Sequence, residues 1–191
     1  RFDVVCSVDT SAPEVFRAAA AAGAGLLNDV RALRREGALA AAAATGLPVC
    51  LMHMQGEPGT MQEAPSYGSV VEEVLAFLEA RLATARAAGI GSERLLVDPG
   101  FGFGKTLAHN VELLRGLDRL ERLDVPVLVG LSRKRMIGAL TGREVDARVA
   151  GGIAAAAVAV LKGARIVRTH DVAWTLDAVR VAEAIRVAGE D

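Results

Sequence analysis

Short apolar runs alternate with longer amphipathic segments along the whole chain. The runs are rich in Val, Ile and Leu, as is typical of buried strands. They lie at 4–8, 26–27, 49–51, 95–97, 127–129 and 166–167. Helical patterns follow them, at 13–22, 37–44, 69–88, 110–122, 148–161 and 174–188. This alternation predicts right-handed βαβ units around a parallel sheet.

Glycines at the ends of helical segments strengthen this prediction. Gly23, Gly46, Gly89 and Gly163 each follow a helical pattern and precede a strand, as helix-terminating glycines do. Six such units fit an open doubly wound sheet, whose ligands bind at one switch point. They also fit an incomplete (β/α)₈ barrel, which needs eight units and in which every strand end can contribute to one mouth.

Each predicted strand is followed by polar residues. Helix capping explains Ser11, Asp29 and Asp171, because such side chains satisfy free N–H groups at a helix start. Capping does not explain Lys134 or the Arg168–His170 pair, since cations oppose the dipole at a helix N-terminus. Cations placed together with carboxylates indicate a ligand that has both anionic and hydrogen-bond-donating parts.

Composition narrows the class of protein. The chain has 191 residues, 52% of them hydrophobic, and a net charge of -1. We therefore expect one globular domain spanning 1–191, with no affinity for nucleic acid and no membrane segment. Cys6 and Cys50 lie in apolar runs, which predicts reduced core thiols in a cytoplasmic protein. Because the chain enters a strand almost directly after Arg1, we expect it to be part of a longer protein.

The stretch "LLVDPGFGFGKTLAHN" at 95–110 resembles a phosphate loop only superficially. A P-loop needs glycine where Pro99 stands, and a dinucleotide fingerprint needs glycine where Lys105 stands. The glycines are then expected to form a tight turn that passes close to a flat ligand. Lys105 is expected to face solvent.

The motifs in combination resemble one family. "SVDTSAPEV", "NDVRAL", "GLPVCLMHMQGEPGTMQEAP", "DPGFGFGKTLAHN", "VGLSRKRMIG" and "RTHDV" together resemble dihydropteroate synthase across essentially the whole chain. The resemblance implies a (β/α)₈ barrel, here represented by strands three to eight. It also implies Mg²⁺, held by a loop of the absent N-terminal part, and a homodimer formed through late helices.

The family reaction condenses 6-hydroxymethyl-7,8-dihydropterin diphosphate with p-aminobenzoate, giving 7,8-dihydropteroate and diphosphate for folate synthesis. Sulfonamides compete with the aminobenzoate. The resemblance implies a dissociative substitution without a protein nucleophile. The protein is therefore expected to position the two substrates and to compensate the charges that develop during the reaction.

The resemblance assigns roles to individual residues. The pterin site comprises Asp9, Asn28, Met52, Asp98, Lys134 and Arg168, the diphosphate site Arg168, Thr169 and His170, and the aminobenzoate site Phe103, Ser132 and Lys134. Of these, Asp9, Asp98, Lys134 and Arg168 are the expected catalytic residues. A carboxylate can accept two adjacent N–H bonds of the pterin, and a planar arginine can both bind phosphate and stack.

Structural alternatives stand beside several of these roles. Asp98 in "DPG" can cap a turn, and Asp9 can cap a helix. Arg133 and Arg135 are interpreted as a solvated charge run, and His109 as a structural residue. His53 ends a strand and resembles no ligand-binding residue of the family.

At the level of the whole chain, two other functions compete with the synthase. One is a pterin-dependent methyltransferase domain, and the other is an inactive pterin-binding fragment or paralogue. The motifs "SRKRMIG", "GFGFGK" and "RTHD" favour the synthase, because a methyltransferase needs no aminobenzoate or diphosphate site.

Overall fold

The computed structural model describes residues 3–57 and 59–187. Its sheet has six strands, all parallel to their neighbours. These are β1 (Ser7–Asp9), β2 (Leu26–Asp29), β3 (Val49–Met52), β4 (Leu95–Asp98), β5 (Val127–Gly130) and β6 (Ala164–Arg168). The helices are α1 (Pro13–Ala21), α2 (Ala38–Thr45), α3 (Val70–Ala87), α4 (Leu107–Arg115), α5 (Arg135–Thr141), α6 (Val149–Leu161) and α7 (Val172–Val187). Three 3₁₀ turns join them, η1 (Ser92–Arg94), η2 (Leu117–Leu123) and η3 (Val145–Ala147).

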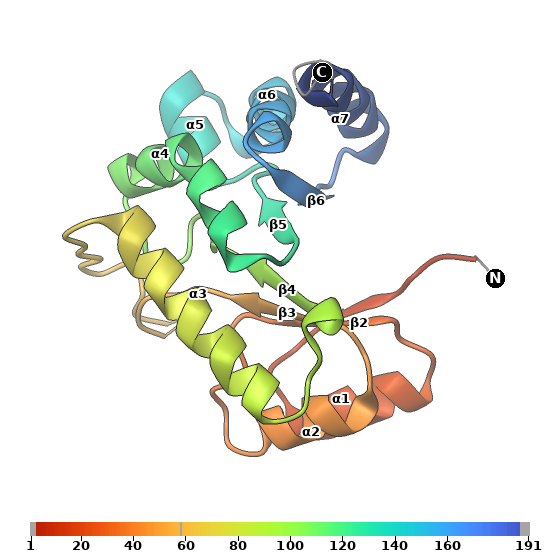
Figure 1. Cartoon of the computed structure of the whole chain (residues 1–191). Coiled ribbons are helices and arrows are strands. Elements are labelled where there is room, and N and C mark those ends of the chain that lie inside the picture. The colour runs from red at the N-terminus through yellow and green to blue at the C-terminus, as the bar shows by residue number, and fades with distance from the viewer. Residues whose placement is uncertain (1–2, 58, 188–191) are drawn as a thin grey trace.

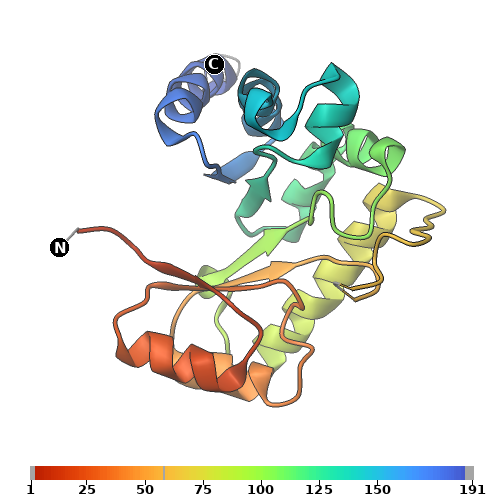
Figure 2. The same cartoon turned by 180° about the vertical axis from the view of Figure 1, so that it is seen from behind.

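The strands lie in the sheet in the same order as in the chain, from β1 at one edge to β6 at the other. A doubly wound sheet reverses its order at a switch point, so that alternative is wrong. Figures 1 and 2 show the sheet curling, with the helices along its outer side. The chain forms a half-barrel of alternating strands and helices, which confirms the barrel prediction.

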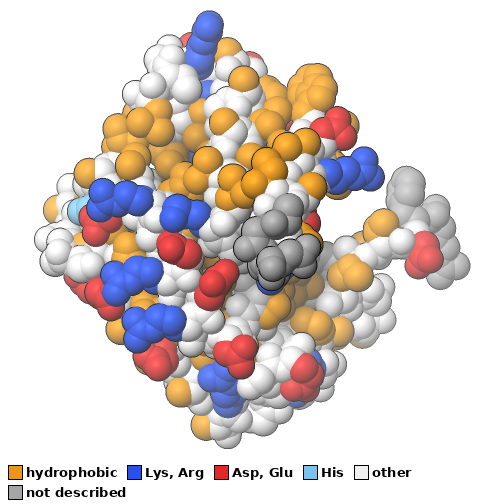
Figure 3. All heavy atoms as spheres, turned by 45° about the horizontal axis from the view of Figure 1, so that its top comes forward, with side chains coloured by type: hydrophobic (Ala, Val, Ile, Leu, Met, Phe, Trp, Pro, Cys, Tyr) orange, Lys and Arg blue, Asp and Glu red, His pale blue; other side chains and the backbone are white. Residues whose placement is uncertain are grey.

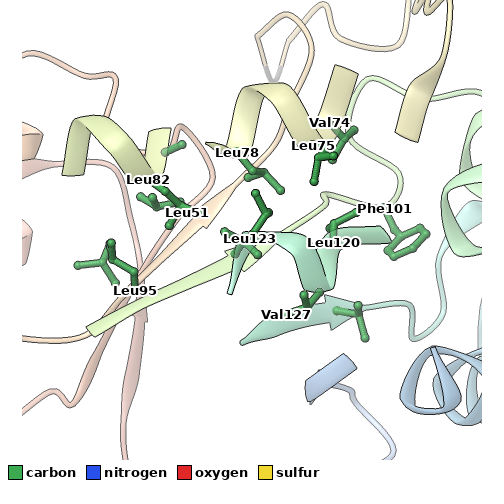
Figure 4. Close-up of a cluster of buried hydrophobic side chains, with 14 of the residues drawn as sticks. Leu51, Val74, Leu75, Leu78, Leu82, Leu95, Phe101, Leu120, Leu123 and Val127 are labelled. Carbon is green, nitrogen blue, oxygen red and sulfur yellow. The ribbon is translucent and has the colours of Figure 1, made fainter. Parts of the chain in front are cut away.

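The core lies between the outer side of the sheet and the helices that cover it. On α3, Val71, Val74, Leu75, Leu78 and Leu82 are buried, and their spacing of three or four residues places them on one face. Figure 4 shows this face against β3, β4 and η2. Burial of these side chains contributes favourable free energy of folding and fixes β3 and β4 from the outer side of the sheet.

One predicted helix is divided in the structure. The pattern at 110–122 becomes α4 and η2, which are separated by Gly116. A side chain at Gly116 would bring its Cβ within 3.0 Å of Val71 Cγ2 on α3, so the chain bends where α3 crosses closely. At its start, α4 extends back to Leu107 because Thr106 and His109 form a capping box. The structural interpretation of His109 agrees with this.

Other local predictions were wrong. β1 begins at Ser7, and the residues before it, Val4 and Val5, are exposed. Cys6 is exposed as well, whereas Cys50 is buried as expected. Ser11 does not cap α1; its hydroxyl donates to Asp29 instead. α5 has only seven residues and was not predicted, because so short an element carries little periodicity.

Within residues 3–57 and 59–187, no helix has both the length and the apolar composition needed to cross a bilayer.

Leu78 tests the packing of α3 on the sheet. Its side chain is fully buried, so Leu78→Ala removes contacts and leaves a cavity, and should lower the free energy of unfolding by about 3 kcal/mol. Leu140→Ala, at a position 59% exposed, should change it by less than about 0.5 kcal/mol. Denaturant titration measures both, and equal effects would contradict this assignment of the core.

Candidate functional site

The carboxyl ends of all six strands meet at one edge of the sheet. Asp9 is level with Asn28 on the neighbouring strand, and Met52 is level with Asp98. Arg168 ends β6 at the opposite edge of the sheet, yet its Nη2 lies 3.4 Å from Asp9 Oδ2. The curl of the sheet therefore brings its first and last strand ends face to face and forms a ring of polar side chains.

Asn28 provides an unsatisfied acceptor in this ring. The residue is 7% exposed, and its Oδ1 is a buried side-chain atom without a hydrogen-bond partner among the described residues. A buried polar atom without a partner costs about 1–3 kcal/mol. Such an atom at a strand end indicates a site for a ligand N–H group.

Asp98 is buried and shaped by its own turn. Its Oδ1 accepts a hydrogen bond from the Gly100 N–H at 2.7 Å, so the predicted turn-capping role is present. Burial raises the pKa of the Asp98 carboxyl, while nearby Lys134 and the Gly100 hydrogen bond act against this rise. The carboxyl group thus stands in a poorly solvated position beside a cation. Met52, the expected pterin contact, is buried on the adjacent strand.

Lys134 and Phe103 lie together, as expected for parts of one subsite. The Lys134 Nζ is 4.9 Å from the centre of the Phe103 ring, a cation–π distance. The same ammonium donates to the carbonyl of Phe101. Burial lowers the pKa of Lys134, and Asp98 opposes this shift. The loop after β4 therefore positions the Lys134 ammonium, through the Phe101 carbonyl and the Phe103 ring.

A cavity of about 180 Å³ joins the ends of β5 and β6. Its lining comprises Gly130, Ser132, Lys134, Arg168, Thr169 and His170. The Ser132 Oγ lies 3.0 Å from His170 Nδ1, and the His170 backbone N–H donates to it as well. The residues expected to bind diphosphate thus share one cavity with two of those expected to bind aminobenzoate.

Arg133 corrects the expectation of a solvated charge run. Its Nη2 and Nε donate to the two oxygens of Asp171 at 2.7 and 3.2 Å. This pair ties the loop after β5 to the loop after β6, and Arg133 also lowers the pKa of Asp171. Arg135 is exposed, as expected. The run "SRKR" gives no sign that its first arginine has an acidic partner 38 residues away.

Lys105 is the largest correction, because it is 3% exposed and not solvent-facing. Its Nζ lies 3.0 Å from Gly100 O, 3.1 Å from Phe103 O and 2.9 Å from His53 Nδ1. Burial lowers the pKa of Lys105 to about 7 and that of His53 to about 3. Sequence inspection missed this contact because His53 is 52 residues away.

The glycines of this loop form the expected tight turn, but part of the expected close approach is wrong. Gly100 and Gly104 have φ values of 70° and 59°. A Cβ at Gly100 would clash with the carbonyl oxygen of His53, and one at Gly104 with that of Gln55. What passes close to these two glycines is therefore the backbone of the β3 loop, and the ligand interpretation does not account for them.

Among the described residues, no group of three or more His, Cys, Asp or Glu side chains could hold a metal ion. Asp9, at the ring, pairs with a cation instead.

Comparisons with known proteins agree with this geometry. The family model of the pterin binding enzymes matches residues 1–170. The dihydropteroate synthase of Escherichia coli strain K12 is 52% identical over 191 residues, all of this chain and 68% of that enzyme.

Solved structures are similarly close. The Yersinia pestis dihydropteroate synthase, crystallised with a sulfonamide drug complex, matches with a TM-score of 0.96 at 50% identity, over 98% of this chain and 69% of that one. The Xanthomonas albilineans enzyme with 4-aminobenzoic acid matches with a TM-score of 0.89 at 56% identity, over 96% and 65% of the two chains. The chain belongs to the dihydropteroate synthase family of pterin binding enzymes.

Proposed function

We propose that the ring of strand ends binds the dihydropterin and that the adjoining cavity binds diphosphate and aminobenzoate. The chain is a transferase of folate biosynthesis by its family. The observation that carries the assignment of the sites is the meeting of β1 and β6 at Arg168 and Asp9. Through this contact, cations, carboxylates and the Asn28 oxygen surround one mouth.

The pterin subsite uses complementary hydrogen bonding. The aminopyrimidinone edge presents adjacent N–H donors, which suit the Asp98 carboxylate in a fork and the unpartnered Asn28 oxygen. Lys134 can donate to the ring carbonyl or to a ring nitrogen. A methyltransferase would share the pterin edge, but it would leave the cationic cavity of Ser132, Arg168 and His170 without a role.

The reaction needs charge compensation more than a nucleophile. The C–O bond to diphosphate breaks first, and the electron pair leaves with the diphosphate, where Arg168 and His170 offset its charge. The carboxylates of Asp9 and Asp98 stabilise the positive charge at the exocyclic pterin carbon. The aminobenzoate nitrogen then forms the C–N bond and loses a proton. The protein supplies alignment of the two reactants.

The aminobenzoate subsite lies between the β4 and β5 loops. The Xanthomonas albilineans relative binds 4-aminobenzoic acid, and another of its structures holds 7,8-dihydropteroate. In this chain the Phe103 ring would pack against the benzene ring, with Ser132 and Lys134 near the carboxylate. Their proximity to the cavity supports this placement.

Magnesium would neutralise part of the diphosphate charge when bound. The described residues do not form a site for it by themselves. We propose that its ligands come from a part of the barrel that this chain, which spans 68% of the Escherichia coli enzyme, does not include. Within this chain, Arg168 and His170 offset the diphosphate charge.

A homodimer through α6 and α7 completes the proposal. Figure 3 shows hydrophobic side chains gathered over the face formed by the helices at the top of Figure 1. Leu161, Trp174, Val181 and Ile185 line a hollow of about 410 Å³ there and are 44–62% exposed. Exposed apolar surface of this kind is typical of an interface.

A cytoplasmic location remains a prediction, with which the two free cysteines agree.

Turnover with labelled aminobenzoate tests the function. It is measured in this chain and in a chimera that adds the remaining part of the Escherichia coli enzyme. Arg168→Met should lower kcat/KM about 100-fold or more, because the leaving group loses its cation. Arg165→Met, on the same strand beside Glu183, serves as the control. Equal effects of the two substitutions, or an inactive chimera, would contradict the assignment.

Acidification tests Asp98. Its pKa is raised by burial, and pterin binding needs the ionised carboxylate. Affinity should therefore be full above the raised pKa and should fall as pH drops through it, at a higher pH than for an ordinary aspartate near 3.9. Titration calorimetry with a pterin measures this fall, which Asp98→Asn should abolish together with tight binding. An identical pH dependence in the Asn variant would rule out the role.

Light scattering tests the dimer. The chain has a mass of 19.9 kDa, and we expect about twice that value in solution. Val181→Glu should shift it to the monomer mass, because the new carboxylate would be desolvated at the interface. Val145→Glu, exposed on η3, should leave the mass unchanged. A monomer mass for the unsubstituted chain would contradict the proposed homodimer.

A further inference from the structure

Lys105 places one buried ammonium among three acceptors. A protonated lysine has three N–H bonds and no acceptor. Its partners are two carbonyls of its own loop, Gly100 O and Phe103 O, and one nitrogen of the β3 loop, His53 Nδ1, all at 2.9–3.1 Å. Donors and acceptors therefore match in number, as a buried cation requires.

His53 is suited to accept this bond. Burial, followed by the charges of Lys105 and Arg34, lowers the pKa of His53 to about 3, although a hydrogen bond to its own backbone acts against this. The ring is therefore neutral near pH 7, and its Nδ1 can carry a lone pair. Phe77 packs edge-on against the ring at 4.9 Å, and the His53 N–H donates to the Asp98 carbonyl. The acceptor is thus fixed in place.

The loop that Lys105 closes carries groups that face the substrates. Asp98 starts it, and the Phe101 carbonyl accepts from Lys134. The Phe103 ring packs against the Lys134 ammonium. Lys105 itself is not among the residues that line the cavity of Ser132, Arg168 and His170. Its contacts with the Gly100 and Phe103 carbonyls hold the turn of this loop in shape.

We infer that Lys105 is a positioning residue for the synthase reaction. Its ammonium joins the β3 and β4 loops and thereby fixes the Phe103 ring and the Phe101 carbonyl, which together place the Lys134 ammonium. This inference rests on the function proposed above. It assigns Lys105 no contact with substrate.

The charge of Lys105 makes the contact sensitive to pH. Burial lowers the pKa of Lys105 to about 7; Asp98 on β4 raises it, and Lys134 before α5 lowers it further. Neutral His53 faces it from the β3 loop. The lowered pKa means that this buried position favours the neutral amine over the ammonium relative to water, so protonation favours opening of the loop. The closed loop should therefore be most stable above about pH 7 and should weaken as pH falls through that value.

Activity of the chimera gives the first readout. Lys105→Met should lower kcat/KM on the order of 100-fold, as displacement of a substrate-facing group does, and should remove the fall in activity below about pH 7. Lys105→Arg, which stays protonated, should recover part of the activity and also lack that fall. Lys162→Met is the matched control, since Lys162 pairs with Asp118 at the surface, and it should behave as the parent.

Side-chain ¹⁵N NMR of Lys Nζ gives a readout that does not need turnover. The chain has three lysines, so few signals compete. A slowly exchanging ammonium resonance should be present at pH 6, should be absent in Lys105→Met and should weaken in His53→Phe, which keeps the ring but lacks the acceptor. His53→Phe also serves if Lys105→Met fails to fold.

The outcomes separate the two proposals. Absence of the protected resonance, or parental kcat/KM and pH profile in Lys105→Met or His53→Phe, would overturn the positioning role. A protected resonance in an unsubstituted chimera that shows no turnover would instead overturn the proposed function and leave the contact between the loops standing.

Discussion

The curl of the parallel sheet is the constraint on which everything else depends. Parallel strands present all their carboxyl ends at one edge, and the twist of each strand bends that edge into an arc. In this chain the arc is long enough for Arg168 on the last strand to reach Asp9 on the first. The ion pair is exposed and contributes little stability. The ion pair matters for the geometry instead, because it shows that the polar ends of the first and last strands face one another.

The core supports that geometry from outside. α3 packs its apolar face on β3 and β4, so the strands that carry Met52 and Asp98 are held rigidly. The backbone that carries Met52 and Asp98 is consequently held in place by the core. Such preorganisation favours charge stabilisation in the substitution proposed above.

Loop contacts then decide the fine positions. The β3 and β4 loops join through Lys105 and His53, and the β5 and β6 loops join through Arg133 and Asp171. Each pair links segments that are distant in sequence, so neither was visible in the chain's local pattern. The isolated charge of Lys105 and the "SRKR" run both suggested solvent exposure. For this reason the expectation failed for Lys105 and for Arg133, whereas Arg135 is exposed.

The sequence by itself determined the strand–helix alternation, five of the helices in outline and the polar residue at each strand end, because periodicity and turn chemistry are local. Its motifs determined the family. Only the tertiary structure decided that Asn28 keeps a buried oxygen without a partner, that Gly116 divides a helix and that Lys105 lies inside. These features depend on burial and on contacts between distant segments, which exist only after the sheet has curled.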